Sequence, residues 1–175
     1  MRDNNKLNRL TYVLFVVYLI AIVWILLFKL GVHFSSMGNR SINLIPFSAP
    51  VILNVKMDYG EMIMNVLIFL PLGIYAGILF KRWSLGIKLL LFFLVSLIIE
   101  GFQYILAVGA FDITDIINNT LGGIIGLMTY FGIEKAFNNS VKAQKFINLI
   151  ATIGTISMIL FLFLLKTNRL GIRYQ

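Results

Sequence analysis

The chain has 175 residues, of which 59% are apolar and only 13% charged, and its mean hydropathy is +0.92. A soluble domain carries about a quarter charged residues, so this composition excludes an ordinary water-soluble protein and indicates a protein embedded in lipid. The net charge of +8 does not indicate a nucleic-acid partner, because the Lys and Arg residues flank the apolar segments, where they set topology and touch anionic membrane lipids.

Five segments are long and apolar enough to cross a hydrocarbon core of about 30 Å, which takes about 20 helical residues. In chain order they are residues 10–30, 61–80, 87–107, 111–130 and 146–165. Each is a continuous apolar run without the alternation of a membrane-spanning strand, so transmembrane strands are not expected. Since lipid offers the backbone no hydrogen-bond partners, we predict an all-α, polytopic membrane bundle of about five transmembrane helices.

The first segment carries no charge from residue 12 to residue 28, and no small-residue cleavage site follows it. It therefore reads as a permanent anchor and not as a signal peptide. With the N-terminus in the cytoplasm, nine of the 15 Lys and Arg residues lie inside and six outside, so the positive-inside rule predicts that orientation. The basic tail, residues 166–173, then lies outside and binds anionic headgroups there, unless the fifth helix does not cross.

We predict that the chain has two parts. Residues 1–133 form a membrane domain of four helices. Residues 134–175 add a cytoplasmic loop, the fifth helix and the basic tail.

The one long connection, residues 31–60, contains Asn43, Pro46 and Phe47 among apolar neighbours. Proline restricts Ile45 to extended conformations. Two interpretations remain open for this connection. It is a re-entrant or interfacial piece that caps the outer mouth of the bundle, or it is an ordinary turn with anchoring side chains.

The second and fourth segments carry signals of close packing. Two glycine pairs have the G-x-x-x-G spacing that permits close helix contact, namely Gly73 with Gly77 and Gly122 with Gly126. Pro71 should kink the second helix and free a carbonyl. The simplest arrangement packs the second, third and fourth helices through these stripes.

Polar side chains gather on two of these helices. Ser96, Glu100 and Gln103 share one face of the third helix, and Asp112, Asp115 and Asn119 share one face of the fourth. In the predicted orientation these groups and Asn65 all lie toward the outer leaflet, and nothing comparable is expected at the inner end. A charged group at the membrane centre costs about 2.5–3.5 kcal/mol on insertion scales, so the cluster is the leading candidate for a functional site.

Several chemistries suit such a cluster. It could hold a divalent cation, which prefers oxygen ligands, or a cationic or hydroxyl-rich headgroup. A carboxylate beside another carboxylate could also act as acid or base. The structural alternative is that hydrogen bonds of about 0.6 kcal/mol each hold the helices together. That alternative explains the carboxylates less well, because no embedded Lys or Arg is expected in the crossing segments to pair with them. The absence of cysteine excludes thiol chemistry.

Four motifs together resemble the VanZ-like family over about residues 10–133. In chain order they are Asn43-x-x-Pro46-Phe47, the run from Asn65 through Pro71 to Gly73, Glu100-x-x-Gln103, and the run from Phe111 through Asp112, Asp115, Asn118 and Asn119 to Gly122. Many members carry an Arg just before the aspartate motif, where this chain has Gly109 and Ala110. The founding member is an accessory protein of glycopeptide-resistance gene clusters, associated with resistance to teicoplanin.

The resemblance implies a multi-pass protein of the bacterial cytoplasmic membrane that lowers susceptibility to lipid-tailed glycopeptides. We expect its outer pocket to bind or shield a lipid-linked cell-wall precursor or a lipoglycopeptide. A membrane enzyme that modifies a lipid-linked envelope precursor is an alternative, but the chain lacks a recognisable nucleophile or phosphate-binding motif. A small transporter is a third class, disfavoured because no paired inverted repeat is visible.

Overall fold

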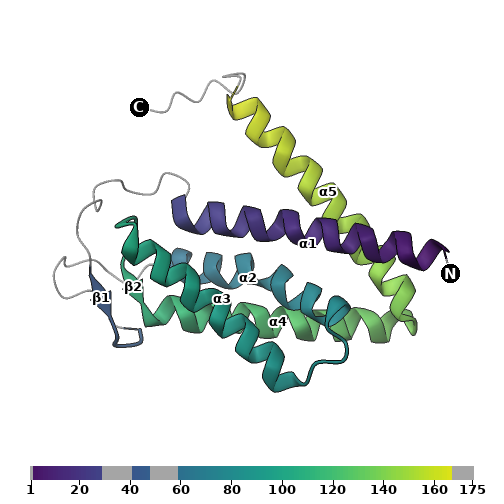
Figure 1. The fold of residues 1–175 in the computed structure, drawn as a ribbon, viewed down its shortest axis with the longest axis horizontal. Coiled ribbons are helices and arrows are strands. Elements are labelled where there is room, and N and C mark those ends of the chain that lie inside the picture. The colour runs from purple at the N-terminus through teal and green to yellow at the C-terminus, as the bar shows by residue number, and fades with distance from the viewer. Residues whose placement is uncertain (1, 29–40, 48–58, 167–175) are drawn as a thin grey trace.

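The computed structural model describes residues 2–28, 41–47 and 59–166. Its elements are α1 (Arg2–Phe28), β1 (Ile42–Asn43), α2 (Tyr59–Leu79), α3 (Leu85–Ile105), β2 (Phe111–Asp112), α4 (Ile113–Phe137) and α5 (Ser140–Lys166) (Figure 1). The five helices are long and apolar enough to cross a membrane, which confirms the predicted all-α membrane bundle. The tail beyond residue 166, and residues 31–40 and 48–58 of the long connection, lie outside the described part.

Three helices extend beyond the apolar runs that predict them. α1 begins at Arg2 instead of residue 10, α4 continues to Phe137 instead of residue 130, and α5 begins at Ser140 instead of residue 146. Hydropathy marks only the part of a helix that suits lipid. The backbone hydrogen bonds of the helix continue past that boundary, where charged side chains reach water.

The predicted cytoplasmic loop after residue 133 is therefore reduced to a tight turn between α4 and α5. Asn138 ends α4 in the left-handed conformation, with φ of 49°. The Asn139 side chain then accepts hydrogen bonds from the backbone N–H groups of Val141 and Lys142, at 2.9 and 3.0 Å. Asparagine favours both positions, because it tolerates the left-handed conformation and satisfies free N–H groups at a helix start.

The contact between α2 and α4 is the most extensive in the bundle. Glycines make it possible: a Cβ added at Gly73 would overlap the Gly123 carbonyl, and one added at Gly126 would overlap the Leu70 carbonyl. Gly122 lies equally close to the Val66 carbonyl. The two backbones therefore touch directly, as small residues allow in membrane helices.

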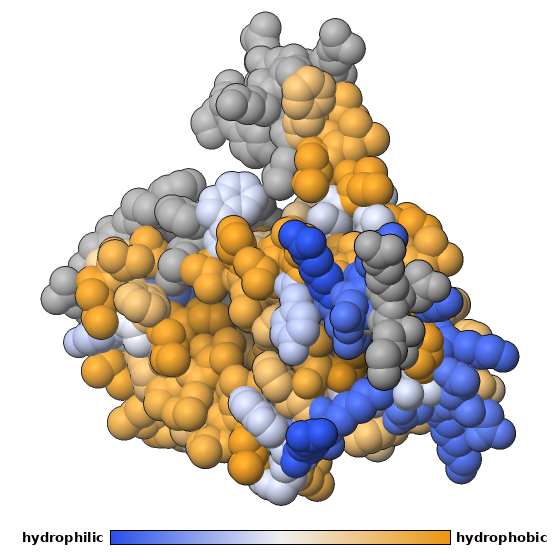
Figure 2. Space-filling model, turned by 45° about the vertical axis from the view of Figure 1, so that its right-hand side comes forward, coloured by the Kyte–Doolittle hydropathy of each residue, from blue (hydrophilic) through white to orange (hydrophobic). Residues whose placement is uncertain are grey.

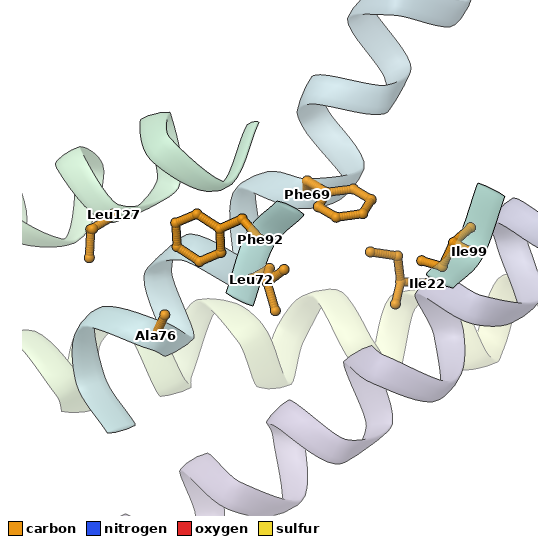
Figure 3. Close-up of a cluster of buried hydrophobic side chains, with 7 residues drawn as sticks. All are labelled: Ile22, Phe69, Leu72, Ala76, Phe92, Ile99 and Leu127. Atoms are coloured by element: carbon orange, nitrogen blue, oxygen red, sulfur yellow. The ribbon is translucent and has the colours of Figure 1, made fainter. Parts of the chain in front are cut away.

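The main buried cluster brings together side chains from four helices (Figure 3). Its members are Ile22 of α1, Phe69, Leu72 and Ala76 of α2, Phe92 and Ile99 of α3, and Leu127 of α4. Phe69 and Phe92 are completely buried. Hydrophobic side chains also cover much of the outer surface, whereas hydrophilic ones gather toward the end where α1 begins (Figure 2). An apolar surface this broad is suited to lipid contact.

Pro71 lies inside α2, and the helix continues through it. Proline removes one backbone donor from the helical ladder and disturbs the carbonyls one turn before it. The Tyr18 hydroxyl of α1 donates a hydrogen bond of 2.9 Å to the Ile68 carbonyl in that turn. A side chain of the neighbouring helix thus supports the α2 backbone beside the proline.

The first turns of α5 pack against the bundle. Ala143, Gln144 and Ile147 are buried, whereas Ile153 and Ile156 are exposed. Beyond its first turns α5 diverges from α1 and leaves the other helices (Figure 1).

Candidate functional site

The candidate site lies at the end of the bundle where α2 and α4 begin, α3 ends and the two strands meet (Figure 1). β1 and β2 pair in parallel, with Ile42 opposite Phe111 and Asn43 opposite Asp112. This pairing is not predictable from the sequence, because two-residue strands leave no periodic pattern. The pairing fixes part of the long connection against the start of α4.

Asn43 and Asp112 form the first link of the site. Asn43 Nδ2 donates to Asp112 Oδ2 at 3.1 Å, while Asn43 Oδ1 accepts from the Ile45 N–H at 3.2 Å. Asp112 Oδ1 accepts from the Thr114 N–H at 2.7 Å and so caps α4. A carboxylate at this position also interacts favourably with the helix dipole.

Residues 41–47 are fastened to α4 at a second point. The Phe47 N–H donates to the Thr114 hydroxyl at 3.0 Å, and Phe47 has a positive φ of 56°. Pro46 precedes it in the same turn. The described part of the connection is thus a turn anchored on the end of the bundle, which combines features of both interpretations drawn from the sequence.

Glu100 reaches the same place from the end of α3. Its side chain is only 2% exposed, and its Oε2 accepts a hydrogen bond of 3.3 Å from the Asp112 N–H. Gln103 is equally buried one turn later. Gly109, in the connection to α4, packs against the Gln103 side chain, since a Cβ there would lie 3.6 Å from Gln103 Cβ.

Two further hydrogen bonds tie α4 to its neighbours. Asn65 Nδ2 of α2 donates to Asp115 Oδ1 at 2.7 Å, and both side chains are buried. Asn119 Nδ2 donates to the Ser96 hydroxyl of α3 at 2.9 Å. The faces predicted on the third and fourth helices therefore meet in the folded protein.

We call this group the carboxylate cluster. It consists of Asn43, Asn65, Glu100, Gln103, Asp112, Asp115, Asn118 and Asn119. Hydrogen bonds link Asn43 and Glu100 to Asp112, and Asn65 to Asp115. The carboxylates thus accept hydrogen bonds from neutral amides and backbone N–H groups, which stabilise negative charge. Hydrogen bonding between helices therefore accounts for part of their stabilisation.

Within the residues that the structure describes, no group of three or more Asp, Glu or His side chains is placed to hold a metal ion. Hydrogen bonds link Glu100 of α3 to Asp112 before α4, and Asp115 of α4 to Asn65 of α2.

Two buried amide atoms in the cluster have no hydrogen-bond partner within the described part of the chain. They are Nδ2 of Asn118 and Oδ1 of Asn119. Asn118 lies off the helix face shared by Asp115 and Asn119, and in the sequence it belongs to the same motif. Buried polar groups are nearly always satisfied, so these two atoms mark a place for water or a ligand.

The expectation that the other end of the bundle lacks polar groups is wrong. Thr11 of α1 is completely buried there, and its hydroxyl accepts hydrogen bonds from Gln144 Nε2 at 2.8 Å and Asn148 Nδ2 at 2.9 Å. Gln144 Nε2 also reaches Asn8 Oδ1 at 3.1 Å. We call Asn8, Thr11, Gln144 and Asn148 the Thr11 cluster. It joins α1 to α5, and each helix alone shows too few polar residues to reveal it.

One cation is nevertheless buried in a predicted crossing segment. Lys88 of α3 is only 5% exposed. It lies about 18 Å along the helix from Glu100, at 1.5 Å per residue, so it does not pair with the carboxylate cluster. Its place near the helix end explains how its burial is tolerated, because a long Lys stem can lie in apolar surroundings while its charge stays near the interface.

The fold and the site define a small multi-pass membrane protein in which three acidic side chains and several amides converge at one end of a helix bundle. The VanZ/LLP1 family profile matches residues 15–138. The chain is also 37% identical over 152 residues to "Protein VanZ" of Enterococcus faecium, an alignment that covers 85% of this chain and 88% of that protein. The chain therefore belongs to the VanZ/LLP1 family. No solved structure gives a significant match.

Proposed function

We propose that this protein binds or shields a lipid-linked or lipid-tailed molecule of the bacterial cell envelope through the carboxylate cluster. In this way it lowers susceptibility to glycopeptides such as teicoplanin. Membership of the VanZ/LLP1 family and the similarity to "Protein VanZ" support this proposal. The bacterial cytoplasmic membrane is the location that the proposal requires.

The observation that carries the proposal is the pair of unpartnered amide atoms beside the carboxylates. Asn118 Nδ2 can donate a hydrogen bond, and Asn119 Oδ1 can accept one. Hydroxyl and peptide groups both donate and accept, and lipid-linked wall precursors and glycopeptides are rich in them. A ligand of this kind would satisfy both atoms, whereas a purely structural cluster gains nothing by leaving them unpaired.

The predicted orientation in the membrane supports the same proposal. The basic residues predict a cytoplasmic N-terminus, which directs the carboxylate cluster toward the outer leaflet. Glycopeptides act on wall precursors outside the membrane. The cluster and the proposed ligand are therefore on the same side.

The test is to remove charge from the cluster while keeping side-chain shape. Glu100→Gln and Asp115→Asn should each abolish the rise in teicoplanin resistance that the protein gives a susceptible host, with membrane levels of the protein unchanged. Glu61→Gln is the matched control, because Glu61 is an acidic residue in the first turn of α2 that is not part of the carboxylate cluster. Full resistance in both cluster variants, at normal protein level, would contradict the proposal.

The same cells separate binding from catalysis. A protein that only binds or shields should leave the masses of extracted lipid-linked precursors unchanged. A new precursor mass that depends on the intact protein and disappears in Glu100→Gln would favour the enzyme alternative. It would also identify Glu100 as an acid or base, because the substitution removes only its ionisable group.

A further inference from the structure

A pocket of about 400 Å³ opens at the end of the bundle opposite the carboxylate cluster. The end of α2, the start of α3 and the last turns of α4 form its walls, including Gly77, Trp83, Lys88 and Tyr130. Tyr130 lies about 22 Å along α4 from Asp115, at 1.5 Å per residue. The pocket is therefore separate from the proposed envelope-ligand site, and nothing in the proposed function uses it.

Lys88 is the unusual residue of this pocket. It lines the cavity and is 95% buried, since only 5% of its surface is exposed. Its ammonium lies 5.7 Å from the centre of the Phe131 ring, and within the described residues it forms no ion pair with a carboxylate. A buried ammonium without an anionic partner is unfavourable, so this geometry favours an anion in the pocket.

The pocket's one carboxylate already has partners. Glu134 Oε1 accepts a hydrogen bond of 3.0 Å from the Tyr130 hydroxyl and lies 3.8 Å from Lys81 Nζ. With Lys81 and Lys88 both lining the cavity, its walls carry one positive charge more than Glu134 balances. The pocket is thus electrostatically suited to an anion.

The walls also suit a lipid. Trp83 and Leu85 line the cavity and are 40% and 61% exposed, so the pocket is open to the surface where aromatic residues meet the membrane interface. Phe131 adds an apolar wall. A phosphate beside Lys88 with glycerol and acyl groups along Trp83, Leu85 and Phe131 would match both the charged and the apolar lining.

We propose that this pocket binds the phosphate of an anionic phospholipid headgroup, with the Lys88 ammonium as its main donor. In the predicted orientation the lipid comes from the inner leaflet. The proposal does not depend on the proposed function at the carboxylate cluster.

Trp83 provides a reporter, because the chain has only two tryptophans. In a Trp24→Phe background, the full-length protein in detergent is titrated with phosphatidylglycerol or with phosphatidylcholine of the same acyl chains. Phosphatidylglycerol should give a saturable change in Trp83 fluorescence at concentrations about tenfold lower than phosphatidylcholine, because the choline cation of phosphatidylcholine is repelled by the excess positive charge of the pocket.

Variants identify the donor. Lys88→Met should weaken phosphatidylglycerol binding by about tenfold or more, while Lys88→Arg keeps the charge and should retain binding. Lys142→Met is the control, because Lys142 is an exposed lysine of α5 that does not line the pocket.

Three results would overturn the proposal. Equal responses to the two lipids would show that the net negative charge of the headgroup is not recognised. Unchanged binding in folded Lys88→Met would remove Lys88 from the site. A saturable response to inorganic phosphate, with none to phosphatidylglycerol, would indicate a free-anion site. If Lys88→Met does not fold, the proposal is tested by comparing the binding of phosphatidylglycerol and phosphatidylcholine to the original protein and to Lys88→Arg.

Discussion

Asn65 of α2 donates a 2.7 Å hydrogen bond to Asp115 of α4, across 50 residues of sequence. The bond is possible because the helices approach so closely that a Cβ at Gly122 would overlap the Val66 carbonyl. Close backbone packing and polar pairing therefore support each other at this end of the bundle. On a single helix in lipid, Asn65 or Asp115 would lack this hydrogen-bond partner.

The first prediction concerns this pair. Asp115→Leu leaves the Asn65 amide buried without its acceptor, which should lower the free energy of unfolding by about 1–3 kcal/mol. Asp115→Asn keeps an acceptor oxygen, so its free energy of unfolding should be much closer to that of the original protein. Thermal unfolding of the purified proteins in detergent would measure both. If Asp115→Leu unfolds at the original temperature, the hydrogen bond contributes nothing to the fold.

The second prediction concerns the glycines between α2 and α4. Gly126→Ala places a methyl group against the Leu70 backbone, and overpacking of this kind costs about 1–3 kcal/mol or more. Gly132→Ala is the matched control in the same helix, because no atom lies within 4 Å of its added Cβ. The control should be neutral or slightly stabilising, since Ala favours helix over Gly. Equal unfolding temperatures for the two variants would argue against close contact.

The third prediction concerns the Thr11 cluster. Thr11→Val preserves shape but removes the hydroxyl that receives the amides of Gln144 and Asn148. Loss of this acceptor should destabilise the contact between α1 and α5 by about 1–3 kcal/mol and increase proteolysis of α5. Thr129→Val serves as control, because the Thr129 hydroxyl bonds only the Ile125 carbonyl in its own helix. Equal protease resistance in both variants would contradict the role assigned to Thr11.

The fourth prediction concerns orientation. The chain has no cysteine, so single cysteines at Ser41 and Lys142, both exposed, report on opposite ends of the bundle. In intact cells an impermeant thiol reagent should label position 41 and leave position 142 unlabelled, as the basic residues predict. Labelling at 142 alone would reverse the orientation and place the carboxylate cluster on the cytoplasmic side.

The helix ends show which features of the fold the hydropathy pattern can predict and which it cannot. The apolar runs located all five helices, because a lipid environment leaves the backbone few alternatives to a helix. They did not locate the turn at Asn138 and Asn139, since hydropathy describes the preference for lipid and not the hydrogen bonds that continue a helix into water. Capping by Asn139 involves only residues two and three positions away, so side-chain chemistry could have placed this boundary.

The sequence by itself determined the class of fold and the polar faces of individual helices, because hydropathy and helical spacing are local properties. Helical spacing predicts that Glu100 shares a face with Gln103, and that Asp115 shares a face with Asn119. Only the tertiary structure decided which groups meet. The pairing of Asn65 with Asp115, the joining of Thr11 to α5 and the burial of Lys88 all depend on which helices are neighbours and at what depth. The choice of neighbouring helices and their relative depth depends on packing between segments distant in the sequence, which the sequence of one helix does not encode.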